Sequence, residues 1–205
     1  MRRSLIRLVL SLSCFALLAS GSPLTLTAQT PGAAKALVPA EPPRAAKELM
    51  DAAVTRAAAE NKAVLVKFGA SWCGWCHKFD KFLEDTTGVG QIMRANFVVV
   101  GLTVLETAQY KAFENPGSAE VAKSMGGDFA KIGIPWFFML DGAGKKIGDS
   151  NMMPDGSNIG MPDFPIEVTG FMDLMKKTAP RLTEDERSRI KVYLDRAAGR
   201  TVIVP

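Results

Sequence analysis

The sequence predicts an α/β fold in which a central mixed β-sheet is flanked by helices, with an extra helical segment at the C-terminus. Three short apolar runs, at residues 63–68, 97–104 and 136–140, are rich in valine or aromatic residues, as in strands that are covered on both faces. Segments with helical spacing precede the first run and lie between the others. With 205 residues, of which 47% are hydrophobic and 22% charged, the chain can bury the core of one or two such domains.

Residues 1–28 have the composition of a secretory signal peptide. Three arginines precede an apolar run at residues 8–18, and small and polar residues follow it. The run is shorter than the roughly 20 residues that a membrane-spanning helix needs. We therefore expect cleavage and export, with the mature protein periplasmic or secreted.

The charge balance of the mature chain argues against nucleic acid as a partner. The whole sequence has 25 Lys and Arg against 21 Asp and Glu, a formal charge of +4. Removal of the three leader arginines leaves 22 against 21, a charge of +1. Phosphate-backbone binding needs several clustered basic residues, and the sequence has no basic stripe.

The first folded elements follow residues 29–44, a Pro- and Ala-rich stretch without an apolar face that is typical of a linker. A helix is predicted at residues 45–61, before the first strand. A second helix begins near Cys73 and precedes the second strand. Its predicted apolar face contains Trp75, Cys76, Phe79, Phe82 and Leu83.

The second half of the chain completes the sheet. A short helix at residues 119–125 precedes the third strand, and a hairpin turn at 141–144 connects it to a fourth strand at 145–148. The sheet is therefore expected to contain both parallel and antiparallel neighbours.

A long loop and two helices close the sequence. Residues 149–165 are rich in Gly, Pro, Asn and Asp, and loops of this length are usually functional or mobile. A helix is expected at 166–178, and a capping box at 183–186 opens a last helix that ends near residue 198. Residues 45–205 are thus expected to form one domain, which we expect to be a monomer.

The mature chain keeps one close pair of cysteines, Cys73 and Cys76, because Cys14 belongs to the apolar run of the leader. One such pair in an oxidising compartment indicates redox chemistry rather than a structural framework. The motif Cys73-Gly74-Trp75-Cys76 follows a buried strand and opens a helix, whose N-terminus stabilises a thiolate. Cys73 is therefore the predicted nucleophile, and Cys76 the thiol that resolves a mixed disulfide.

Two features occur together: the motif SWCGWC follows AVLVKFGA, and Ile134-Pro135 follows a short helix and precedes a β-hairpin. With these features, the sequence resembles the thioredoxin superfamily over roughly residues 45–178. The resemblance implies a thioredoxin-like fold and thiol-disulfide oxidoreductase activity on protein thiols and disulfides, with no cofactor. It also implies that Pro135 is a cis-proline lying against the cysteine pair. A redox partner must then recycle the dithiol: a membrane electron donor for a reductase, or a reoxidising protein for an oxidase.

Two positions differ from thioredoxins, which have proline at the place of Trp75 and a buried aspartate at the place of Lys67. A lysine that points at the pair favours the thiolate; alternatively, its stem packs and its ammonium reaches solvent. Trp72 and Trp75 flank the pair and are expected to form an apolar rim for a partner polypeptide, or to be ordinary packing residues.

Two other functions fit parts of the sequence. Cys73 to His77 also matches C-x-x-C-H, the attachment signature of c-type haem, although such cytochromes place it in a small helical domain. A thioredoxin-like binding module without turnover is the second alternative. No metal site is expected, because two cysteines and one histidine fall short of four zinc ligands.

Overall fold

The computed structural model describes residues 36–86 and 88–201. The predicted signal peptide and the first part of the predicted linker, residues 29–35, lie outside this range. The described part of the linker has no helix or strand, but the N–H of Leu37 donates to the carbonyl of Gln109 (2.8 Å) and the carbonyl of Arg44 accepts from the Asn115 side chain (3.0 Å). These residues therefore lie against the domain instead of extending away from it.

The elements occur in the predicted order, with two additions. They are α1 (Ala46–Glu60), β1 (Ala63–Gly69), α2 (Gly74–Glu84), α3 (Val89–Asn96), β2 (Phe97–Thr103), the 3-10 helix η1 (Lys111–Phe113), α4 (Ser118–Ser124), β3 (Trp136–Leu140), β4 (Lys146–Asp149), α5 (Pro165–Thr178) and α6 (Glu184–Ala197).

The four strands form one mixed sheet in the order β2-β1-β3-β4. β1 is parallel to β2 and antiparallel to β3, so that Lys67 lies opposite Gly101 on one side and Phe137 on the other. β3 and β4 form the antiparallel hairpin. The predicted mixed sheet is confirmed, and with its flanking helices it gives the predicted α/β architecture.

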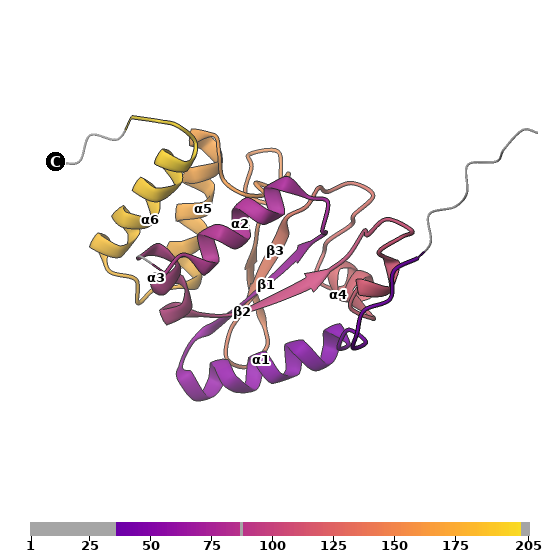
Figure 1. Cartoon of the computed structure of the whole chain (residues 1–205). Coiled ribbons are helices and arrows are strands. Elements are labelled where there is room, and N and C mark those ends of the chain that lie inside the picture. The colour runs from indigo at the N-terminus through magenta and orange to yellow at the C-terminus, as the bar shows by residue number, and fades with distance from the viewer. Residues whose placement is uncertain (1–35, 87, 202–205) are drawn as a thin grey trace, which may run out of the picture. The chain divides into compact units, whose positions relative to one another are not determined.

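Each face of the sheet is covered by its own helices (Figure 1), as the alternation of side chains along a strand requires. Leu65 and Phe137 pack with α2, α3, α5 and α6 in one apolar cluster. Val66 and Phe138 point to the opposite face, where they pack with α1 and Ala122 of α4. Every residue of β3 is buried, which explains its uninterrupted apolar sequence.

α3 was not predicted, because its eight residues include Gly90 and Asn96, which are weak helix formers. Its stability comes from packing: Ile92 and Met93 are buried in the cluster that α2 and α6 share. Gly90 is required there, since a Cβ at that position would overlap the carbonyl oxygen of Asp85.

Trp75 is the exception on the predicted apolar face of α2. Cys76, Phe79, Phe82 and Leu83 are buried, but Trp75 is 44% exposed. The first turn of α2 lies at the end of β1, beyond the large apolar clusters, so a side chain there has little core to pack against. Its ring instead has the ammonium of Lys78 at 3.9 Å from its centroid.

The C-terminal helices match the prediction closely. The Thr183 hydroxyl accepts the N–H of Glu186 (3.2 Å), and the Glu186 carboxylate accepts the N–H of Thr183 (2.8 Å), which is the predicted capping box. None of the helices within residues 36–86 and 88–201 is both long and apolar enough to cross a membrane.

Candidate active site

Cys73 and Cys76 form a disulfide at the start of α2, with their Cα atoms 5.2 Å apart. β1 ends at Gly69, and the carbonyl of Ala70 accepts the N–H of Cys73 (3.1 Å), which turns the chain into the helix. Cys73 is the N-cap residue, and its sulfur accepts the N–H of Cys76 at 3.1 Å. A negative charge on this sulfur after reduction is stabilised by that N–H and by the positive end of the helix.

Both cysteines are largely covered, Cys73 at 4% and Cys76 at 3% exposure. Exposure therefore does not distinguish the attacking from the resolving sulfur; the N-cap position of Cys73 does. The end of β1 lies very close to Cys76, since a Cβ at Gly69 would be 3.3 Å from the Cys76 sulfur. Gly74 has no such constraint, because a Cβ there would meet nothing within 4 Å.

The Ile134–Pro135 peptide bond is cis, and the segment lies against the disulfide. The carbonyl oxygen of Ile134 is 3.6 Å from the Cys73 sulfur. Asn158, in the long loop after β4, holds this segment: its side-chain N–H groups donate to the carbonyls of Gly133 (3.0 Å) and Pro135 (2.9 Å). Sequence analysis missed Asn158, because a polar residue in an aperiodic loop carries no signal of what it contacts.

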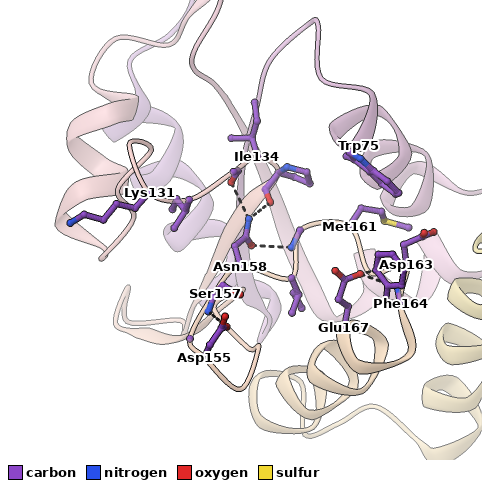
Figure 2. A pocket seen from close by; sticks show the side chains of 16 residues that line it. Trp75, Lys131, Ile134, Asp155, Ser157, Asn158, Met161, Asp163, Phe164 and Glu167 are labelled. Atoms are coloured by element: carbon purple, nitrogen blue, oxygen red, sulfur yellow. Dashed lines mark hydrogen bonds between the residues drawn. The ribbon is translucent and has the colours of Figure 1, made fainter.

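A groove of about 570 Å³ extends from the cis-proline segment (Figure 2). Trp75 of α2, Ile134 and Pro135 line it, so the structure brings these three predicted site residues together. The other wall is the loop that leads into α5, including Met161 and Phe164. The groove is therefore built partly from the 149–165 loop.

Trp72 lies apart from this groove. Its indole N–H donates to the carbonyl of Leu105 (2.8 Å), while the residue remains 56% exposed. Trp72 therefore does not line the groove that Trp75 lines.

A second pocket of about 470 Å³ includes Cys76, and in it Lys67 of β1 forms an ion pair with Asp80 of α2. Their side chains are 19% and 28% exposed. Lys67 therefore neither points alone at the cysteines nor extends freely into solvent, the two alternatives that the sequence left open. Asp80 is one helical turn after Cys76, and this spacing is the signal that could have placed it near the pair.

The loop before Cys73 is held by Glu106, which is 8% exposed. Its carboxylate accepts the backbone N–H of Ser71 (2.6 Å) and the Ser71 hydroxyl (2.7 Å). The carbonyl of Ser71 in turn accepts a hydrogen bond from Nε2 of His77 (2.8 Å). This network connects the loop after β2 with both ends of the cysteine motif.

The haem alternative does not fit this arrangement. The motif lies beside a mixed sheet instead of in a small helical domain, and the two sulfurs are bonded to each other. The His77 ring is engaged with Ser71. Within the described part of the chain, no group of three or more His, Cys, Asp or Glu residues is placed to hold a metal ion.

Comparison with known proteins gives one family match: residues 45–142 match the model of a family described as thioredoxin-like. No curated protein matches the sequence significantly.

Several solved structures are similar to this chain. The disulphide isomerase from Xylella fastidiosa is 19% identical, with 78% of this chain and 97% of the other covered and a TM-score of 0.45. A thiol:disulfide interchange protein from a Bacteroides species is 18% identical, with 75% and 94% covered and a TM-score of 0.37. The C-terminal domain of DsbD from Neisseria meningitidis, in its oxidised form, is 20% identical, with 52% and 84% covered and a TM-score of 0.35.

Proposed function

We propose that the chain is a thiol-disulfide oxidoreductase that exchanges disulfides with polypeptide substrates outside the cytoplasm. The proposal is supported by the match of residues 45–142 to the thioredoxin-like family and by the Cys73–Cys76 disulfide within them. Cys73 forms the mixed disulfide and Cys76 resolves it. The observation that carries this proposal is the position of the disulfide, with the Cys73 sulfur at the N-cap of α2 and 3.6 Å from the carbonyl of Ile134.

The oxidised enzyme reacts in two steps. A substrate thiolate attacks the Cys73 sulfur, which breaks the bond to Cys76 and forms a bond between Cys73 and the substrate; the Cys76 thiolate then takes up a proton. A second substrate thiolate attacks the substrate sulfur of this mixed disulfide and releases the Cys73 thiolate. The substrate loses two electrons and two protons and becomes a disulfide, and the enzyme becomes a dithiol.

The reduced enzyme runs the same steps backward. The Cys73 thiolate attacks a substrate disulfide, and Cys76, after losing its proton, attacks the Cys73 sulfur and releases the substrate dithiol. The reduction potential of the pair and its redox partner decide the net direction. Equilibration of the Cys73–Cys76 couple with glutathione measures that potential directly.

Turnover is tested by insulin reduction with a thiol donor and by oxidation of a reduced, unfolded protein. The wild type is expected to be active in at least one assay, and Cys73→Ser in neither. Cys76→Ser is expected to accumulate a mixed disulfide on Cys73, visible as a mass increase that a reductant removes. An inactive wild type would favour the binding-module alternative.

The proposal includes export, with residues 1–28 as a cleaved signal peptide and 29–44 as a linker before the domain at 45–205. It is supported by the leader composition and by the single close cysteine pair after it. The N-terminal sequence of protein recovered from the periplasm or medium tests it. Recovery of the intact chain from the cytoplasm alone would contradict export.

A further inference from the structure

The groove beside the disulfide carries an excess of negative charge. Asp155, Asp163 and Glu167 line it, against one basic residue, Lys131. The ammonium of Lys131 is already paired with Asp128, at 3.1 Å. The mature chain as a whole is almost balanced in charge, so this excess of carboxylates is a local property of the groove.

The carboxylates have fixed surroundings. Hydrogen bonds from the hydroxyl and the backbone N–H of Ser157 lower the pKa of the Asp155 carboxyl below its ordinary value, which keeps it charged. Glu167 accepts the backbone N–H groups of Asp163 and Phe164, each at 2.9 Å. In Figure 2, Asp155 lies beside Ser157 on the loop, and Asp163 and Glu167 lie together at the start of α5.

The remaining lining is apolar and partly open. Trp75 is 44% exposed and Phe164 is 64% exposed, and Met161 lines the groove with them. Exposed aromatic side chains beside a cavity are typical of surfaces that bind polypeptides. The groove therefore offers contact area for an apolar side chain and negative charge for a cation.

The groove is continuous with the reactive sulfur. Ile134 lines it, and the carbonyl of the same residue is 3.6 Å from the Cys73 sulfur. Residues that neighbour a cysteine bonded to Cys73 are consequently within reach of the groove.

Hydrogen bonds within the chain hold the loop that carries the acidic residues. Asn158 ties the loop to the carbonyls of Gly133 and Pro135. Arg200, after α6, donates to the carbonyl of Asp163 and to the carboxylate of Asp195. These bonds hold the loop against the cis-proline segment and against the segment that follows α6.

We infer that this groove selects substrate segments in which the reactive cysteine is accompanied by a lysine or arginine and an apolar residue. The inference rests on the proposed function and adds a substrate class to it. The occupant is an extended segment of the substrate polypeptide, held while its cysteine is bonded to Cys73. Charge complementarity and continuity with the disulfide are the two observations that support it.

The test is a competition between cysteine peptides for Cys73 in the Cys76→Ser variant. The reduced variant is first loaded by reaction with the symmetric disulfide of a peptide that contains Ser, Leu and one Cys. The Cys73 thiolate attacks this disulfide, keeps one peptide as a mixed disulfide and releases the other as a thiol. A peptide in which Lys replaces Ser, or one in which Glu replaces it, is then added as a free thiol. Mass spectrometry gives the ratio of the two adducts at equilibrium. Each exchange breaks one sulfur–sulfur bond and forms another, so no oxidant is needed.

The basic peptide is expected to be preferred about tenfold over the neutral one, and the acidic peptide to be disfavoured, with both effects weakening as salt is added. Asp155→Asn with Asp163→Asn is expected to bring the ratios close to one. Asp173→Asn is the matched control for either single variant, Asp155→Asn or Asp163→Asn, because each of the three removes one negative charge and Asp173 lies at an exposed position of α5 outside the groove.

Equal adducts with all peptides would overturn the inference and leave the proposed function intact. If Asp173→Asn weakened the preference as much as the groove substitution, the inference would also be overturned, because the overall charge of the protein would then explain the preference for the basic peptide. A wild-type dimer in sedimentation that Phe164→Ser dissociates would assign the groove to a second copy and overturn it too. Failure of every peptide to form an adduct would overturn the proposed function itself.

Discussion

Lys67 and Asp80 form an ion pair in the pocket that contains Cys76, with the cation on the strand and the anion on the helix. The cysteine pair is therefore next to a lysine whose charge is balanced by a carboxylate. A lone lysine would favour the thiolate strongly. In the ion pair, the effects of the ammonium and of the carboxylate on a more distant sulfur largely cancel. The two members should act in opposite directions when they are separated by mutation.

Lys67→Met is expected to reduce the thiolate fraction of the reduced enzyme at neutral pH about three- to tenfold, because it leaves the Asp80 carboxylate uncompensated near the sulfurs. Asp80→Asn is expected to raise it. Ultraviolet absorbance of the thiolate against pH measures both. The double variant is the control and should resemble the wild type; unchanged titrations in both single variants would contradict the electrostatic coupling.

Asn158→Asp is expected to lower the free energy of unfolding by about 2 kcal/mol and to slow disulfide exchange. The change removes the two N–H groups that donate to Gly133 and Pro135 and places a negative charge against their carbonyls. Urea denaturation and the insulin assay measure the two effects. Asn158→Ala is a useful companion, since it removes the donors without adding charge and should retain more exchange activity. Normal stability in Asn158→Asp would show that the loop does not hold the cis-proline segment.

Glu106→Ala is expected to destabilise the oxidised protein by about 2–3 kcal/mol, because it leaves the backbone N–H of Ser71 without its acceptor. Ser71→Ala removes the hydroxyl alone and should cost about 1 kcal/mol. The double variant should cost clearly less than the sum of the two, since both changes remove the same hydrogen bond. Additive costs would mean that Glu106 acts on the cysteine loop by another route.

The stability of the α6 region should depend on pH through Asp195. Burial raises the pKa of its carboxyl, but hydrogen bonds from Lys191 (2.7 Å) and Arg200 (2.9 Å) outweigh burial, and the pKa lies below the ordinary value. A carboxyl with a lowered pKa stabilises the fold above its ordinary pKa, near 3.9, and loses this contribution as the pH falls through the folded value.

Asp195→Asn is therefore expected to be about 1–2 kcal/mol less stable than the wild type at neutral pH, with the difference shrinking below about pH 4. Chemical denaturation over a pH series measures it. Asp173→Asn, at an exposed site of α5, should stay within about 0.5 kcal/mol of the wild type throughout. A constant difference for Asp195→Asn across the series would contradict the linkage.

The sequence predicts the sheet and most helices because the patterns that indicate them lie within each element's own residues. β3 is continuous apolar sequence, and α6 has a capping box at Thr183 and Glu186. The position of the disulfide at the start of α2 follows from the same local pattern, a buried strand followed by an amphipathic helix.

The missing parts depend on contacts between distant segments. α3 is stabilised by packing against α2 and α6. Its apolar residues Val89, Ile92 and Met93 have helical spacing, but the helix is only eight residues long, and a pattern this short does not by itself distinguish a helix from a loop. The partnership of Lys67 with Asp80 requires the packing of α2 on β1 to be known. The groove needs the path of the 149–165 loop, which its aperiodic sequence does not specify.

Arg200 links the C-terminal helix to the loop before α5, and this link matters for protein engineering. Its guanidinium joins Asp195 of α6 to the backbone of Asp163, so the segment after α6 holds the loop that lines the groove. If the loop alone were grafted onto another protein, it would lose the hydrogen bond from Arg200 to Asp163. The smallest segment that could be transplanted with its support intact therefore runs from the 149–165 loop through α5 and α6 to Arg200.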